Sequence, residues 1–574
     1  MKLLHLLVIS SVFFGLAFKS TADSPAAQVS IVADPSAGTP VRHGLERLEA
    51  ALKTKGVRYE EVSAPERAQG QTLIFAGLPA MSSGVTARVK ALGITVPSAP
   101  ESLVIHMTKW KEKPALLLTG SDDRGLMYSL LEVADRIGWS ASVSNPLSEV
   151  RNTIESPSVT DRGVTIYTMQ QARFEERLHD ANYWPKYFDM LASDRFNSFR
   201  VFFGYDTDGY MCPAYPYFVD TPGFPDVKVV GLSKEQQQSN ASDLHRLIRM
   251  AHDRGIRVTL GFWCHNAQTS TSARAASQGQ PGKVVGMKPA DFIPYTQAAL
   301  ATMLREFHDA DGVLYLMNPE SGLSLQDAKS FWGALSTSMK EAAPNMQYEV
   351  RAKGVSDDIP QHALDMGLKI WMNTKYWAEQ VGLPFPPSHI QELNQFERRH
   401  GYSDMLKSPR DYDLHYTLWT SGTTRILLWG DPDYVKRLTG TLSMGGAQGG
   451  FDVAEPLATK MQGHPQDMKP FDLLTSQYRY YDYEFERYWH FFQVFGRLTY
   501  NPATPTEEWN HEFEMHYGKD AAPYVEKDFT APVKSFHTSQ PTACRRIVFP
   551  RFQDGQRCRE RKTWAIMRRR SRVT

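Results

Sequence analysis

The sequence predicts an α/β protein in which a small N-terminal α/β domain precedes a (β/α)₈ TIM barrel and a helical C-terminal region. Three observations predict this. Strand-length apolar runs alternate with helical patterns over residues 28–150, the alternation recurs eight times between residues 161 and 453, and an aromatic-rich helical stretch follows. Eight strands separated by helices or long loops over roughly 300 residues are typical of a barrel and too many for a six-strand doubly wound sheet.

The composition is that of a globular protein. The chain has 574 residues, of which 42% are hydrophobic, with 64 Lys and Arg against 63 Asp and Glu. A collagen-like fibre, wholesale disorder and a disulfide scaffold are therefore excluded. The near-zero net charge argues against nucleic acid as a partner. Residues 544–574 contain eleven Lys and Arg against two Asp and Glu, so a mildly acidic body precedes a basic end.

Residues 1–22 have the layout of a secretory signal peptide. Lys2 precedes an apolar stretch that ends at Phe18, and the small residues at 20–22 suit a signal-peptidase cut. The apolar stretch is shorter than the ~20 residues that a transmembrane helix needs. We expect cleavage and export, which makes the mature protein secreted or periplasmic with no membrane span. A retained anchor is the alternative.

Residues 23–155 are predicted to form the small α/β domain. Strands are expected at 28–33, 72–77, 102–107 and 115–119, and helices at 41–53 and after a cap at Asp122 or Asp123. The loop after the first strand contains a single glycine, so it lacks the phosphate cradle of a nucleotide site.

Residues 160–465 are predicted to form the barrel. Its strands are expected at 164–167, 198–203, 257–262, 313–317, 347–353, 368–373, 425–429 and 450–453. Its helices are expected at 184–193, 234–254, 292–310, 325–342, 358–366, 412–420 and 432–442. Because barrel enzymes carry their chemistry at the C-terminal ends of the strands, the residues that follow each strand are the candidates for a site.

The fourth strand leads to Glu320. A carboxyl group partly desolvated at a barrel mouth can protonate a leaving oxygen, so Glu320 is a candidate general acid. A helix cap or a salt bridge is the alternative. The fifth strand carries Glu349, Arg351 and Lys353 on one face, which we expect to point inward. Either these charges neutralise one another, or Arg351 and Lys353 bind an anionic ligand.

The sixth strand leads to Lys375, Trp377 and Glu379. A cation, aromatic rings and a carboxylate suit a sugar ring, which has apolar faces and a rim of hydroxyls. An ordinary loop, which contains the same residue types, is the alternative.

The remaining candidates follow strands three, seven and eight. Asp431 is either an acid–base group or the cap of a helix that begins at Pro432. Asp452 and Glu455 have opposite parity, so a regular strand aims only one of them inward. His265 after strand three is a candidate substrate contact.

The other machinery of known enzyme classes is missing. We find no Walker loop, nucleophile elbow or His-Glu-x-x-His motif and no clustered metal ligands, so no metal and no cofactor are expected. Glycoside hydrolysis needs only two positioned carboxyl groups, one acid and one base or nucleophile.

Residues 466–529 are predicted to be helical and residues 530–574 to form a basic, disordered tail. The helical region is rich in aromatic rings, which we expect to pack against the barrel, with a sugar site as the alternative. These rings are Tyr478, Tyr480, Tyr481, Tyr483, Phe485, Tyr488, Trp489, Phe491 and Phe492.

Two motifs resemble glycoside hydrolase family 67, the α-glucuronidases. The stretch Gly-Ser-Asp-Asp-Arg-Gly-Leu-Met-Tyr at 120–128 is similar to their N-terminal domain, which is like that of β-hexosaminidases. The stretch Phe-Gly-Arg-Leu-Thr-Tyr-Asn-Pro at 495–502, followed by Trp509 and Phe513, is similar to their helical region. The resemblance covers residues 25–525 and implies the same fold.

The resemblance also implies roles for site residues. The family's general acid is a glutamate in a Ser-Glu-Gly context after strand four, which points to Glu320. Its Trp-Arg segment on strand five corresponds to Arg351 and the residue before it, and its further carboxylates follow strands six and seven, where this chain has Glu379 and Asp431. The function expected is an exported, α-glucuronidase-like glycoside hydrolase with a carbohydrate substrate. The alternatives are a non-catalytic carbohydrate-binding barrel and a polysaccharide lyase.

Overall fold

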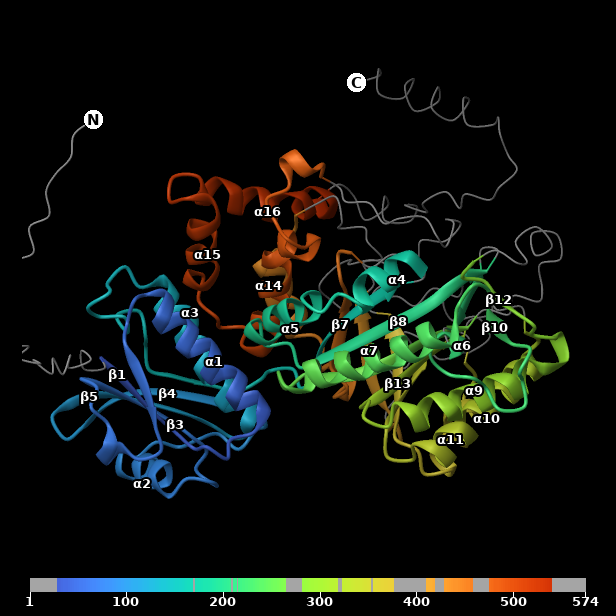
Figure 1. Cartoon of the computed structure of the whole chain (residues 1–574), viewed down its shortest axis with the longest axis horizontal. Helices are drawn as coiled ribbons and strands as arrows, with labels where there is room; N and C mark the ends of the chain where they lie inside the picture. Colours follow the sequence, from blue (N-terminus) through green and yellow to red (C-terminus); the bar gives the residue numbers. More distant parts are fainter. Residues whose placement is uncertain are drawn as a thin grey trace, which may run out of the picture.

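The computed structural model has three parts: an N-terminal α/β domain, a closed parallel barrel and a C-terminal group of helices (Figure 1). This confirms the predicted fold class. The predicted signal peptide lies outside the described residues, as does the chain beyond Thr538. The described residues are 28–168, 171–207, 210–213, 215–264, 281–317, 323–352, 355–375, 409–418, 428–457 and 474–538.

The N-terminal domain is a six-stranded sheet with helices on both faces. Its strand order is β2-β1-β3-β5-β4-β6, in which only β4 runs antiparallel to both of its neighbours. The strands are β1 (Val29–Ala33), β2 (Tyr59–Val62), β3 (Thr72–Ala76), β4 (Leu103–Trp110), β5 (Lys113–Gly120) and β6 (Thr153–Glu155). The four predicted strands are present, and β2 and β6 are additional.

Two long helices, α1 (Thr39–Thr54) and α3 (Asp123–Trp139), pack together on one face of this sheet, and α2 (Ser83–Ala91) covers the other (Figure 1). Helix α3 begins where the sequence predicts, because the Asp122 carboxylate accepts a hydrogen bond from the Gly125 backbone N–H at 2.8 Å. The same carboxylate accepts from the backbone N–H of Glu101, which ties the helix start to the sheet.

Eight parallel strands close into a barrel. Each strand pairs with the next along the chain, and the last pairs with the first through a register that places Phe451 beside Arg162. Because all eight run the same way, their C-terminal ends meet at one mouth. The strands are β7 (Arg162–Thr168), β8 (Ser198–Thr207), β11 (Arg257–Cys264), β13 (Gly312–Met317), β14 (Gln347–Arg351), β15 (Ile370–Lys375), β16 (Asp413–Leu418) and β17 (Phe451–Ala454).

Helices surround the barrel, and most of them lie where the helical spacing of apolar residues predicts. They include α4 (Gln171–Leu178), α5 (Tyr183–Ser193), α6 (Tyr215–Phe218), α7 (Lys234–His252), α9 (Phe292–Glu306), α10 (Leu325–Ala342), α11 (Asp358–Asp365) and α13 (Pro432–Thr439). Helix α10 has the predicted bounds because Ser324 caps it, accepting a hydrogen bond from the backbone N–H of Asp327. No helix of the described residues is long and apolar enough to cross a membrane.

The prediction of the seventh strand was wrong. Residues 412–420 were expected to be helical, but they contain strand β16, whereas residues 428–430 belong to no strand and residues 425–427 lie outside the described part. The apolar residues Leu414, Tyr416 and Leu418 alternate with polar ones, and this period of two is that of a strand, whose side chains point alternately to its two faces. Over so short a window, alternation also satisfies part of a helical pattern.

The described residues of the C-terminal region include three α-helices: α14 (Trp489–Tyr500), α15 (Glu507–Tyr517) and α16 (Ala522–Thr538). Most rings of the aromatic stretch pack in the core, as expected, including Phe485, Tyr488 and Phe492. Two rings do not, because Tyr478 and Tyr480 are 67% and 62% exposed.

A buried ion cluster joins the three parts of the molecule. Glu132 of α3 accepts hydrogen bonds from Arg136 of the same helix at 2.8 Å, from Arg195 after α5 at 2.7 Å, and from Arg497 of α14. Arg136 also reaches Glu508 of α15 at 2.7 Å. The N-terminal domain, the barrel and the C-terminal helices therefore share one set of charges.

Candidate active site

An aromatic layer fills one side of the barrel interior toward the mouth. The rings of Tyr167 on β7 and Phe202 on β8 stack with centroids 4.6 Å apart, and Trp263 on β11 packs edge-on against Tyr167 at 6.0 Å. Leu314, Leu316 and Ala454 complete this cluster. Gly261 is needed here, because a Cβ atom at that position would lie 2.7 Å from the Phe202 ring. These side chains form an apolar floor beneath the mouth.

A buried ion pair crosses the other side of the interior. Arg200 on β8 donates from Nη2 to Glu349 Oε1 on β14 at 2.7 Å, and its Nε lies 3.1 Å from both carboxylate oxygens. Strands β11 and β13 separate β8 from β14 in the wall, so the two side chains meet through the interior. Gly163 on β7 leaves room for this arginine, since a Cβ atom there would lie 2.4 Å from Arg200 Nη1.

Hydrogen bonds extend this pair across neighbouring strands. Asn373 on β15 donates from Nδ2 to Glu349 Oε2 at 3.3 Å, and its Oδ1 accepts from Arg351 Nη1 at 3.0 Å and from Thr417 Oγ1 at 2.8 Å. Both charges of β14 therefore point inward, as the spacing predicts. Glu349 belongs to an internal ion pair, which is the structural role, whereas Arg351 is the last residue of β14 and lies at its mouth end.

Asp452 on β17 is a buried carboxylate held by several hydrogen bonds. It accepts from Thr165 Oγ1 at 2.5 Å and from Thr417 Oγ1 at 2.9 Å, and one oxygen lies 2.8 Å from His415 Nε2. Burial alone would raise the pKa of this carboxyl, but the His415 hydrogen bond and the nearby charge of Arg200 outweigh it and lower the pKa. Asp452 is thus an ionised, inward-facing group that fixes the ring of His415.

Glu455 points the opposite way, as its parity predicts. Its Oε1 lies 3.0 Å from Arg177 Nη1 of α4, and its Oε2 accepts from the Tyr187 hydroxyl of α5 at 2.6 Å. Burial raises the pKa of Tyr187 well above its usual value, with the charge of Glu455 acting in the same direction. Glu455 fastens two helices to the outside of the barrel beside the mouth.

Asp431 caps helix α13. Its carboxylate is buried and accepts hydrogen bonds from the backbone N–H groups of Asp433 at 3.0 Å and Tyr434 at 3.4 Å, with Pro432 as the first helical residue. Because β16 and not 425–429 is the seventh strand, Asp431 does not directly follow a barrel strand. The geometry of Asp431 is therefore that of a helix cap, the alternative to an acid–base group.

Replacing Asp431 with asparagine separates the two roles. Asparagine caps a helix about as well as aspartate, so Asp431→Asn is expected to leave the melting temperature nearly unchanged. An amide cannot act as a base, but if Asp431 serves only as the cap, turnover is expected to stay within a few-fold of that of the unsubstituted protein. Asp431→Ala, which removes the cap, is expected to cost about 1 kcal/mol of stability. A large loss of kcat in the asparagine variant, without a loss of stability, would restore Asp431 as the base.

Of the other predicted site residues, His265, Glu320, Lys353, Trp377 and Glu379 follow strand ends but lie outside the described residues, whereas Lys375 ends a strand. His265 comes directly after β11, Glu320 three residues after β13, and Lys353 two residues after β14. Trp377 and Glu379 follow β15 by two and four residues. Lys375 is the last residue of β15, where its register partner is Thr417 on β16.

Three residues of the barrel network were not predicted from the sequence: Arg200, His415 and Arg177. A signal for Arg200 was present, because an arginine that shares parity with Ser198 and Phe202 in an otherwise apolar strand points into the barrel. This is the reasoning that identified Glu349. His415 was missed because its strand was assigned as a helix, and no local pattern predicts the contact of Arg177.

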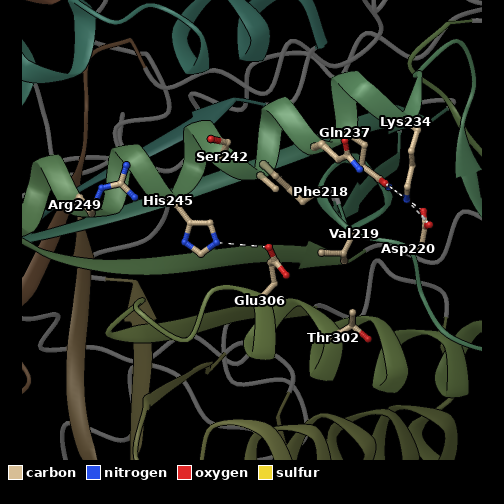
Figure 2. Close-up of a pocket in the computed structure, with 12 residues that line it drawn as sticks. Phe218, Val219, Asp220, Lys234, Gln237, Ser242, His245, Arg249, Thr302 and Glu306 are labelled. Carbon is tan, nitrogen blue, oxygen red and sulfur yellow. Dashed lines mark hydrogen bonds and ion pairs between the residues drawn. The ribbon is translucent and has the colours of Figure 1, made fainter.

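A groove of about 620 Å³ lies elsewhere, on the outer wall between α7 and α9 (Figure 2). Lys234 pairs with Asp220 at one end, and His245 lies 3.6 Å from Glu306 further along. None of the predicted site residues lines this groove. Within the part of the chain that the structure describes, no group of three or more His, Cys, Asp or Glu side chains could hold a metal ion.

Comparisons with known proteins identify the fold. No protein-family model matches the chain, and no curated protein matches it. A GH138 enzyme targeting pectin rhamnogalacturonan II matches with a TM-score of 0.61 at 17% identity, over 87% of this chain and 54% of its own. A Flavobacterium johnsoniae chitobiase of family GH20 matches with a TM-score of 0.49 at 10% identity, over 89% of this chain and 71% of its own.

The chain therefore spans about half the length of the GH138 enzyme. At such low identity the likeness concerns the fold alone. The fold shared with the GH138 enzyme is the predicted barrel preceded by an α/β domain.

Proposed function

We propose that the chain is an exported glycoside hydrolase, α-glucuronidase-like, that cleaves a glycosidic bond in a polysaccharide fragment. The observation that carries the proposal is the order of residues at the barrel mouth. Strand β13 ends three residues before Glu320, and the neighbouring strand β14 ends at the buried cation Arg351. An acid and a binding site for an anionic sugar thus follow adjacent strands.

In this proposal Glu320 protonates the leaving oxygen and Glu379 activates the attacking water. Glu379 follows the end of β15, whereas Asp431 is engaged as a helix cap, so Glu379 is the preferred base. An inverting reaction needs the two carboxyl groups about 6.5–9.5 Å apart, which leaves room for that water. Asp452 acts indirectly, by fixing His415 within the barrel.

Binding of the sugar is assigned to the cations and rings that follow the strands. Arg351 offers a planar fork that matches a uronate carboxylate, and Lys353 and Lys375 add positive charge beyond the ends of β14 and β15. Trp377 is proposed to stack on the sugar ring, and His265 to contact its hydroxyls. The aromatic floor around Tyr167 keeps water from entering the barrel beneath the substrate.

The test is hydrolysis of aryl glycosides and uronic-acid oligosaccharides, with products identified by mass and anomeric NMR. Glu320→Gln is expected to lower kcat by about 10²–10⁴-fold with little change in sugar affinity, because the amide cannot donate the proton. The loss is expected to be smaller for a 2,4-dinitrophenyl glycoside, whose leaving group needs no proton. This dependence on the leaving group distinguishes the acid from the base.

Glu341→Gln is the matched control, since Glu341 is an exposed glutamate on α10. Turnover that survives Glu320→Gln unchanged would reject the assignment of the acid. Sugar binding by the unsubstituted chain without turnover of any substrate would instead favour a carbohydrate-binding barrel, and a product that absorbs in the ultraviolet would identify a lyase.

A further inference from the structure

We propose that a hollow beside the barrel mouth binds a uronate-bearing stretch of the same glycan, at a distance from the bond that is cleaved; this rests on the proposed function. The hollow has a volume of about 570 Å³ and lies between the start of α5 and the segment that precedes α14. Its polar and aromatic lining residues are Asn182, Lys186, Arg479, Tyr481, Asp482 and Tyr483.

The hollow lies at the mouth end of the barrel. Glu455, directly after β17, accepts a hydrogen bond from the Tyr187 hydroxyl at 2.6 Å. This contact holds the first turns of α5 beside the strand ends. Asn182 and Lys186 belong to these turns. The hollow and the mouth therefore lie at the same end of the barrel.

Two tyrosine rings give the hollow an aromatic surface. The hydroxyl of Tyr483 donates to Asp180 at 2.9 Å, and its ring packs edge-on against Tyr183 with centroids 5.2 Å apart, so its position is fixed. Tyr481, two residues earlier in the chain, also lines the hollow, although most of its side chain is buried. Rings held in this way present a surface that costs little entropy when a sugar face packs on it.

Each ring has a cation near its face. Lys186 Nζ lies 5.3 Å from the centroid of Tyr483, and Arg479 Cζ lies 5.6 Å from that of Tyr481. An aromatic ring beside a cation matches a uronate residue, whose ring has an apolar face and whose carboxylate is anionic. This combination favours an acidic glycan over a neutral one.

Lys186 is held by a partner that a ligand can replace. Its Nζ lies 2.5 Å from Asp482 Oδ2 and 3.8 Å from Glu486 Oε1, and the side chains of Lys186 and Asp482 are 45% and 75% exposed. Exposed ion pairs contribute little stability, so a ligand carboxylate displaces Asp482 at low cost. Asp482 therefore competes with the glycan for Lys186.

Affinity gel electrophoresis tests this, with glucuronoxylan or polygalacturonate in the gel and a neutral cellulose derivative for comparison. The unsubstituted protein is expected to be retarded by an acidic polysaccharide and not by the neutral one. Loss of one exposed ion pair lowers affinity by up to about fivefold, so loss of two lowers it by up to about 25-fold. Lys186→Glu with Arg479→Glu is therefore expected to raise the dissociation constant about tenfold. Asp482→Ala is expected to lower it, because the competing carboxylate is gone.

Lys53→Glu with Lys90→Glu is the matched control, because it changes the net charge equally on exposed residues of the N-terminal domain. The proposal would be overturned if the control pair weakened binding of the polysaccharide equally, or if the Lys186 and Arg479 variant were retarded as much as the unsubstituted protein. It would also be overturned if neither acidic polysaccharide retarded the unsubstituted protein. Retardation is measured without turnover. If the protein binds the polysaccharide in this way but cleaves no glycoside, the proposed hydrolase activity is refuted, whereas the proposed binding site in the hollow is not.

Discussion

Replacing Arg200 with methionine is expected to lower the free energy of unfolding by about 3–5 kcal/mol, because removal of one partner from a buried ion pair leaves the other charge uncompensated. Arg200 is 1% exposed and contacts Glu349 through three hydrogen bonds. After the substitution Glu349 keeps only the weaker donor Asn373, at 3.3 Å, among the contacts described above. Asp161, 3.4 Å from Arg200 Nη1, loses a cation as well.

Urea denaturation at pH 7 measures this effect, with two controls. Arg249→Met makes the same change at an exposed position of α7 and is expected to alter stability by at most about 0.5 kcal/mol. Arg200→Lys keeps the charge but loses the planar fork of the guanidinium group. Its free energy of unfolding is expected to lie between those of Arg200→Met and the unsubstituted protein. Equal stabilities of Arg200→Met and Arg249→Met would show that the interior pair contributes nothing to the barrel.

The barrel was predictable because its strands are buried on both faces. Such strands appear as short apolar runs, and the inward positions of β14 were identified because charges in that setting can face only the interior. The prediction of the seventh strand failed because Leu414, Tyr416 and Leu418 have the period of a strand within a window too short to exclude a helix. A strand was therefore predicted at residues 425–429, so that Asp431 was wrongly expected to follow a strand end.

Partners of buried charges were not predictable. Arg200 and Glu349 are 149 residues apart, and Glu455 and Arg177 are 278 apart. Parity along a strand predicts which side chains face inward, but the choice of partner depends on how the barrel closes. The candidate acid Glu320 was located by a different argument, since its place after β13 follows from strand order alone.

Replacing Arg497 with methionine is expected to destabilise the junction of the three parts by about 3–5 kcal/mol, since it too removes one partner from a buried cluster. Arg497 contacts Glu132 and Asp135 of α3, and its Nη1 lies 3.8 Å from Glu508 of α15. Burial alone would raise the pKa of Glu132, but Arg497, Arg195 and Arg136 outweigh it and hold the pKa well below its usual value of 4.5.

The pH dependence of this effect has a definite sign. A carboxyl group whose pKa is lowered by folding contributes stability that is fully present above its unfolded pKa and is lost as the pH falls through the folded one. Asp135, the second carboxyl that Arg497 contacts, changes charge between pH 7 and pH 4, because burial raises its pKa to about 6 although Arg497 opposes the shift. The difference in stability between the unsubstituted protein and Arg497→Met is therefore expected to be larger at pH 7, where Asp135 is charged, than at pH 4, as measured by urea denaturation at both values. A difference that grows toward low pH would contradict the ion cluster as its source. Arg67, an exposed arginine of the N-terminal domain, is a suitable control, because Arg67→Met removes the same charge from the surface of the protein.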